Sequence, residues 1–134
     1  MITNTLHIRF QDLESFMQEG SEASQNFSPL IQAKDELVFA SIASFDKFLT
    51  GQKLHILSAI LARKPDSIYA LAKIVDRDFA NVSRDCTALE QKGFIKLEDA
   101  NDERGSKIPR LVFDYNVITV HLPTKLVYSH TLAA

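Results

Sequence analysis

Hydrophobic and polar positions alternate near the start of the chain and then change to a helical spacing. The alternation over residues 6–10 (LHIRF) predicts a short β-strand, because successive side chains of a strand point to opposite faces. Apolar residues at positions 13, 16 and 17 are spaced as on one face of a helix, which we expect to end at Gly20. Residues 21–28 then predict a polar loop, residues 37–42 a second strand, and residues 45–49 the start of another helix.

Three consecutive helices are predicted from Thr50 onward. Pro65 ends the first helix, and a tight break at Asp76-Arg77 separates the second from the third. The expected capping residues are Thr50, then Asp66 or Ser67, then Asp78. The residues expected to face inward are Leu54, Leu57 and Leu61, then Ile68, Leu71, Ala72 and Val75, then Phe79, Val82, Cys86 and Leu89.

The pattern returns to strands after Gly93, which ends the third helix. Residues 94–97 and 108–113 predict two strands joined by the polar loop 99–106, and residues 117–121 predict a third strand ended by Pro123. Two helices joined by a short turn and followed by a charged hairpin make a winged helix-turn-helix. We therefore predict an α+β fold, in which a three-helix core and a β-hairpin wing follow an N-terminal α/β arm.

Length and charge set the expected domain boundaries. With 134 residues the chain fits one domain with an appended arm, and its net charge of −2 does not identify a nucleic-acid binder. Residues 1–49 hold three basic residues against seven acidic ones, whereas residues 50–115 hold eleven against ten. We expect residues 1–49 to form an acidic dimerisation or partner-binding arm. Residues 50–122 would then form the winged helix-turn-helix domain, and residues 123–134 a tail.

Several classes of protein are disfavoured by what the sequence contains. Cys86 is the only cysteine, so an internal disulfide is excluded, and its place on the inward stripe indicates a buried hydrophobic residue. The four histidines have no metal-ligand spacing, and no phosphate loop or nucleophile motif is present. We expect no enzyme activity, cofactor or metal. The start of the chain lacks signal-peptide features, and the apolar stretch 54–62 is too short to span a bilayer, so we expect a cytoplasmic protein without membrane contact.

The outward face of the third predicted helix carries candidate chemistry for reading DNA bases. A major groove admits one helix, whose exposed side chains meet the base edges. Arginine can bond guanine through two hydrogen bonds, asparagine can do the same with adenine, and the methyl groups of threonine or alanine can meet thymine. Our candidates for base contacts are Ala80, Asn81, Arg84 and Thr87.

Other polar residues are candidates for holding the DNA backbone. The expected phosphate contacts are Lys73, Arg77, Ser83, Lys107 and Arg110. Arg104 lies at the tip of the predicted wing, where it can enter a minor groove. Asp102 and Glu103 are hypothesised to orient Arg104 by pairing with it.

Each candidate also has a plain structural interpretation. Arg84 can be an ordinary solvated helix residue, and Asn81 can cap the helix instead of reading a base. Arg104 is equally well explained as a turn charge. Asp85 would be repelled by phosphates, so we expect it to pair with Arg77 or Lys73.

The segment LTGQKLHILSAILARKPDSIYALAKIVDRDFANVSRDCTALEQKGFIKLE carries a family resemblance. It resembles small bacterial and archaeal winged-helix transcriptional regulators, some of which are described as antitoxins, over about residues 39–122. The most specific matching features are Arg77-Asp78, Asn81-Val82, Arg84-Asp85, Leu89 and Gly93. The resemblance implies that residues 79–92 form the recognition helix. Asp76 departs from the family's usual glycine, and Ser83 from a common histidine or lysine. The wing is more weakly similar to that of MarR-type repressors.

The expected function is sequence-specific binding of double-stranded operator DNA by a transcriptional regulator. Because one recognition helix covers few base pairs, we expect a homodimer, acting as a repressor. The alternative is a protein-interaction module or antitoxin that neutralises a partner toxin through the N-terminal arm. A third possibility, a regulator that senses a small molecule, requires a pocket that the sequence does not show.

Overall fold

The computed structural model describes residues 4–11 and 35–124. The helix expected near residues 13–20, the loop at residues 21–28 and the tail from residue 125 lie outside the described residues. The described chain divides into two compact units. We call residue 4 with residues 49–116 the winged-helix unit, and residues 5–11, 35–48 and 117–124 the sheet unit.

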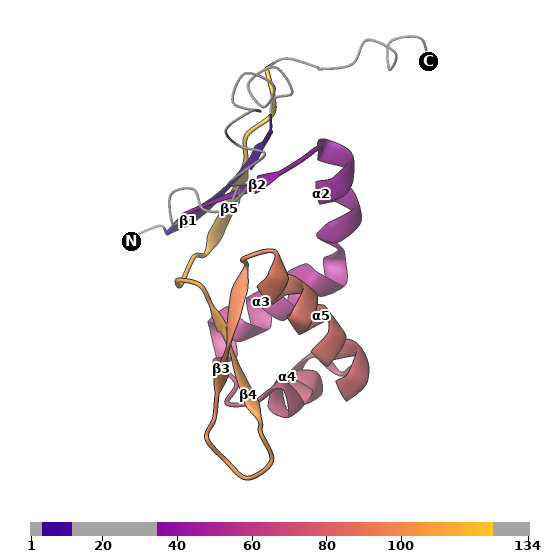
Figure 1. Cartoon of the computed structure of the whole chain (residues 1–134), viewed down its shortest axis with the longest axis vertical. Coiled ribbons are helices and arrows are strands. Elements are labelled where there is room, and N and C mark those ends of the chain that lie inside the picture. The colour runs from indigo at the N-terminus through magenta and orange to yellow at the C-terminus, as the bar shows by residue number, and fades with distance from the viewer. Residues whose placement is uncertain (1–3, 12–34, 125–134) are drawn as a thin grey trace, which may run out of the picture. The chain divides into compact units, whose positions relative to one another are not determined.

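The sheet unit contains three parallel strands in the order β2-β1-β5, drawn at both ends of the colour scale in Figure 1. They are β1 (Thr5–Phe10), β2 (Glu36–Phe39) and β5 (Val117–Val120), and helix α2 (Ile42–Phe48) follows β2. Leu6 and Ile8 of the central strand are fully buried. The ring of Phe39 meets that of Phe45 edge-on, with their centroids 5.2 Å apart. This unit confirms the strand expected from the alternation over residues 6–10. The strand expected at residues 37–42 is shorter than expected, because it ends at Phe39 and helix α2 begins at Ile42.

The strand expected at residues 117–121 also forms, but its partner lies in the sheet unit. Ile118 pairs with Leu6, and Val120 pairs with Ile8. The expected domain boundary includes this strand in residues 50–122, whereas the contacts divide the chain after Asn116 and group β5 with the sheet unit. The physical reason is that β1 has a second open edge, and the apolar residues of β5 are in register with its buried leucine and isoleucine.

The winged-helix unit begins with three helices, which lie in order along the middle of the colour bar in Figure 1. They are α3 (Gly51–Arg63), α4 (Ile68–Val75) and α5 (Phe79–Gln91). The side chains of Thr50, Ser67 and Asp78 cap them by accepting hydrogen bonds from backbone N–H groups three residues later. Four residues of α4 and three of α5 are buried as expected, namely Ile68, Leu71, Ala72, Val75, Val82, Cys86 and Leu89.

Two inward-facing expectations are wrong. Leu54 is 45% exposed, because α3 turns a different arc inward and buries Ile56, Leu57 and Ile60. Phe79 is 49% exposed. Helical spacing places it about 60° from Val82, at the edge of the buried stripe and in the first turn of α5.

The wing is an antiparallel hairpin of β3 (Ile95–Asp99) and β4 (Lys107–Leu111). Ile95 pairs with Leu111 near its base, and Asp99 pairs with Lys107 near its tip. Phe94 and Ile95 are buried, and the hydroxyl of Tyr115 donates a 2.9 Å hydrogen bond to the Phe94 carbonyl. These elements confirm the predicted α+β winged helix-turn-helix fold. No helix in the described ranges combines the length and the hydrophobicity that a membrane crossing requires.

Candidate nucleic-acid interface

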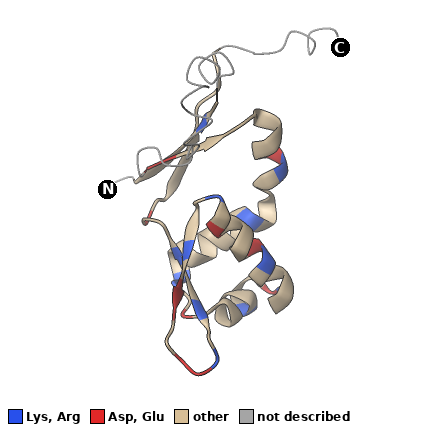
Figure 2. Ribbon diagram, in the orientation of Figure 1, with Lys and Arg blue, Asp and Glu red and all other residues tan. Residues whose placement is uncertain are grey.

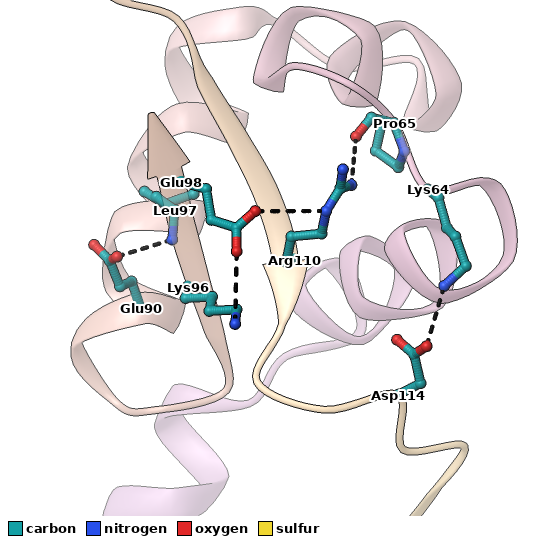
Figure 3. Close-up of polar contacts among 8 residues, drawn as sticks. All are labelled: Lys64, Pro65, Glu90, Lys96, Leu97, Glu98, Arg110 and Asp114. Carbon is teal, nitrogen blue, oxygen red and sulfur yellow. Dashed lines mark hydrogen bonds and ion pairs between the residues drawn. The ribbon is translucent and has the colours of Figure 1, made fainter. Parts of the chain in front are cut away.

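Helix α5 is fixed on the winged-helix unit by one face and exposed on the other. Val82, Cys86 and Leu89 are fully buried and anchor the helix. Glu90 adds a polar tie, because its carboxylate accepts a 2.9 Å hydrogen bond from the Leu97 N–H in β3 (Figure 3). The four candidates for base contacts, Ala80, Asn81, Arg84 and Thr87, are all exposed. The helix thus presents the expected face to solvent, and its position is held from behind.

Two of the exposed side chains on α5 bond each other. The Arg84 guanidinium donates a 2.8 Å hydrogen bond from Nη1 to the side-chain oxygen of Asn81. This bond leaves the amide nitrogen of Asn81 and the remaining guanidinium donors of Arg84 for other partners. The Thr87 hydroxyl donates a 3.0 Å bond to the Ser83 carbonyl, so its methyl group is the part free for an apolar contact. The Ser83 side chain is partly exposed on the flank of the same helix.

Arg77 is engaged inside the protein. Its Nη1 atom lies 2.9 Å from a carboxylate oxygen of Asp85, and both side chains are about four-fifths buried. The contact is an ion pair without the alignment of a hydrogen bond, since no described group accepts a well-aligned bond from Nη1. The expected pairing of Asp85 is therefore confirmed. The same pairing directs Arg77 toward α5 and away from a phosphate.

Lys73 keeps its charge at the surface of α4. Its side chain is exposed, and the ammonium lies 4.7 Å from the centre of the Tyr69 ring. A cation above an aromatic face gains a modest attraction and is held in a narrower range of positions. Lys73 is thus a positioned cation beside the turn that leads into α5.

The two basic residues of β4 differ in their surroundings. Arg110 donates a 3.3 Å hydrogen bond to the Pro65 carbonyl, and its Nε lies 3.8 Å from Glu98, as Figure 3 shows. It therefore ties the wing to the connection between α3 and α4. Lys107, at the start of β4, is exposed and has no polar partner among the described residues. Of the two, Lys107 is the one free to meet a phosphate.

The wing loop is organised by Asp102. Its carboxylate accepts hydrogen bonds from the backbone N–H groups of Ser106 at 2.9 Å and Arg104 at 3.1 Å. The bonds from Ser106, and to a lesser degree that from Arg104, lower the pKa of Asp102. Asp102 therefore orders the backbone on both sides of Gly105, and no described carboxylate forms an ion pair with the Arg104 side chain. The hypothesis that acidic neighbours orient this side chain by pairing is replaced by ordering of the backbone.

The charges on the winged-helix unit are mixed in sign. Figure 2 shows acidic and basic residues following one another along the wing and along α5. The wing loop and the N-terminal end of α5 lie toward the same end of this unit (Figure 1). The arrangement favours specific contacts by individual side chains over a general attraction to polyanions.

Sequence patterns missed an open hollow between α4 and α5. It has a volume of about 330 Å³ and is lined in part by Tyr69, Lys73 and Phe79. The position of Phe79 could have indicated this hollow. Phe79 is the first residue of α5, and no preceding helical turn covers its side chain. The hollow enlarges the candidate interface beyond the four residues on the outward face of α5.

Two further groups bear on alternative chemistry. Burial raises the pKa of the Cys86 thiol to about 12, which keeps it protonated. Within residues 4–11 and 35–124, no three or more histidine, cysteine or acidic side chains are grouped as ligands for a metal ion. His7 and His121 form a single hydrogen-bonded pair in the sheet unit, 2.8 Å apart.

Comparisons with known proteins give one family match. A family model described as HVO_A0114 matches residues 48–120, which is more than half of the chain and includes α3, α4, α5 and the wing. No curated protein matches the chain.

Solved structures with similar folds include regulators from bacteria and archaea. A homodimeric winged helix-turn-helix domain from Mycobacterium bovis, described as a possible ArsR-family regulator, is 23% identical, covers 55% of this chain and has a TM-score of 0.44. The chain spans 65% of that domain. A possible transcriptional regulator from Methanosarcina mazei is 20% identical over 55% of this chain and 66% of its own, with a TM-score of 0.43. MepR of Staphylococcus aureus, in a complex with DNA, is 24% identical over 73% of this chain and 70% of its own, with a TM-score of 0.42.

Proposed function

The chain belongs to the HVO_A0114 family, and we propose that it is a sequence-specific DNA-binding regulator of transcription. In this proposal α5 enters the major groove of double-stranded operator DNA, and the wing loop lies against a neighbouring groove. The observation that carries the proposal is the exposed face of α5 on a helix anchored by fully buried Val82, Cys86 and Leu89. A rigid helix with short polar side chains facing outward is what reading of base edges requires.

The proposed base contacts come from Ala80, Asn81, Arg84 and Thr87. The bond between Arg84 and Asn81 holds the guanidinium close to the helix before DNA arrives, which lowers the entropy lost on binding. Arg84 is matched to a guanine, because its remaining donors can reach O6 and N7 together. Ala80 and the methyl group of Thr87 are matched to apolar edges of the groove.

The proposed backbone contacts come from three exposed cations and one partly exposed serine. Lys73, Lys107 and Ser83 meet phosphates, and Arg104 enters the minor groove. Arg77 and Arg110 act mainly by positioning, because one is paired with Asp85 and the other is bonded to the Pro65 carbonyl. The arginines thereby hold α5 and the wing in the places from which the other residues act.

The proposed regulator is a homodimer that represses transcription. One α5 contacts only a few base pairs, so two copies on a two-fold symmetric site reach a useful affinity. The sheet unit offers exposed apolar side chains for such a contact, namely Ile42, Val117, Val120 and Leu122. In this proposal the operator overlaps the promoter, so that the bound dimer represses by excluding RNA polymerase.

Selection from random double-stranded DNA with the purified full chain tests the proposal. We expect one enriched sequence with two-fold symmetry. We then expect Arg84→Ala to bind it about tenfold to a hundredfold more weakly and to lose preference at one base pair. The matched control is Arg63→Ala, which removes an exposed arginine from α3. The absence of any enriched sequence, or full and equally selective binding by Arg84→Ala, would contradict the proposed function.

A second candidate function is neutralisation of a partner protein, such as a toxin, through residues 1–49. Ile42 of this region is exposed, and a partner can cover it together with Val117, Val120 and Leu122 of the same sheet unit as well as a second copy can. Co-purification of the chain with the product of the neighbouring gene distinguishes the two functions. A stable complex that forms without DNA, together with no selected DNA sequence, would favour this candidate over the regulator.

A further inference from the structure

Phe79 is the large apolar residue of α5 that lies outside the buried stripe of the helix. Its side chain is 49% exposed in the first turn, next to the exposed Ala80. A half-exposed phenylalanine alone is ordinary on a protein surface. Here a second large aromatic residue, Tyr69 near the start of α4, is 59% exposed and lines the same hollow. Both aromatic side chains therefore line one hollow beside the first turn of α5.

Charges around this hollow disfavour a phosphate as its occupant. Lys73 is held near the Tyr69 ring, and the charge of Arg77 is already offset by an ion pair. The carboxylates of Asp76 and Asp78 also line the hollow. A phosphate inside the hollow would meet two negative groups, so an uncharged group is the better occupant, and the exposed Lys73 meets a phosphate outside the hollow.

We propose that Phe79 recognises a thymine in the operator by packing against its 5-methyl group, with Tyr69 completing an apolar wall. This inference rests on the proposed function, because it requires α5 to lie in the major groove. Residues in the N-terminal part of a recognition helix contact base edges, which is where Phe79 lies. The thymine methyl is the apolar group that the bases display in the major groove, so it is the group a phenyl ring can distinguish.

Deoxyuridine is the direct probe, because uracil and thymine differ only by this methyl group. Burial of one methyl group against an apolar surface changes affinity by about fourfold. In the selected operator, each thymine is replaced by deoxyuridine one position at a time. Binding is then measured for the full wild-type chain, for Phe79→Ala and for Phe79→Leu, with Arg63→Ala as the control.

We expect wild type and Arg63→Ala to lose about fourfold at the thymine that Phe79 contacts in each half-site, whether or not Ala80 or Thr87 contacts other thymines. At that position Phe79→Ala should bind the thymine and deoxyuridine operators equally, and Phe79→Leu should keep part of the preference. The ratio within each variant is independent of its folded fraction, so a loss of stability does not obscure the result. Equal binding of all deoxyuridine operators by wild type, or an unchanged preference in Phe79→Ala, would overturn the inference and leave the proposed function standing. Failure to select any DNA would overturn both.

Discussion

Asp76 occupies the turn between α4 and α5 in a left-handed backbone conformation. Its φ is 56° and its ψ is 52°, values that cost a residue with a side chain about 1–2 kcal/mol, although aspartate tolerates them better than most. Asp76 therefore carries backbone strain in this turn that a glycine would avoid.

Substitution of Asp76 measures this strain. We expect Asp76→Gly to be about 1 kcal/mol more stable than Asp76→Ala, because only glycine adopts the left-handed conformation without steric cost. Urea unfolding of both variants gives the difference. The matched control is the same pair at Asp66, an exposed loop residue outside the positive-φ set, where alanine should be at least as stable as glycine. An equal difference in stability between the glycine and alanine variants at both positions would contradict backbone strain at Asp76.

Cys86 is expected to be inert in the folded protein. It is fully buried, and desolvation, reinforced by the nearby Asp85 charge, raises the pKa of its thiol to about 12. The reactive thiolate is therefore almost absent near neutral pH. Iodoacetamide should leave the native chain unmodified, as judged by mass spectrometry, and should label it fully in urea. Rapid labelling without urea would show that the thiol is accessible in the folded chain and would contradict this prediction.

At the scale of the elements, strand β4 of the wing carries one basic residue that is free in solvent and one that is bonded within the protein. Lys107 is exposed at the start of β4, whereas Arg110 joins β4 to the Pro65 carbonyl and approaches Glu98. A free cation contributes to DNA binding through displaced counterions. A residue that is bonded within the protein contributes to DNA binding only indirectly, by holding the hairpin in position.

The salt dependence of DNA binding separates these two roles. Lys107→Ala should reduce the slope of log affinity against log salt by about 1 and leave stability unchanged. Arg110→Ala should leave the slope nearly unchanged and lower the free energy of unfolding by about 0.5–1.5 kcal/mol, the usual value of one hydrogen bond. The measurements are binding titrations at several salt concentrations and urea unfolding. A reduced slope for Arg110→Ala would return that residue to the phosphate contacts.

Local patterns were sufficient to predict most elements of the winged-helix unit. The caps at Ser67 and Asp78 and the buried stripe from Val82 to Leu89 depend on residues within one helix, so sequence spacing contains the needed information. The partner of β5 could not be predicted, because a strand of four residues without a clear buried face is compatible with many sheet edges. The same limit applies to Arg110, whose partner lies 45 positions away in the chain.

At the scale of the whole molecule, the two ends of the described chain meet in one sheet. β1 and β5 pair in parallel although they are separated by more than one hundred residues, and the winged-helix unit lies between them in sequence. The side chains of His7 and His121 bridge these segments by a hydrogen bond of 2.8 Å. One neutral ring must accept the proton that the other donates, so the bridge requires that at least one imidazole be uncharged.

This hydrogen bond makes the stability of the sheet unit sensitive to acid. Desolvation, followed by the charges of Arg9 and His7, lowers the pKa of His121 below 6.5, while Glu36 opposes the shift. Because the folded pKa is lowered, the stabilisation is complete above about pH 6.5 and is lost as the pH falls below that value. Urea unfolding at about pH 7.5 and about pH 5.5 should therefore show a drop in stability that is smaller in His121→Gln. The control is His55→Gln, which removes an exposed histidine from α3. An equal drop in all three proteins would mean that acid acts elsewhere and that protonation of His121 does not set the stability of this sheet.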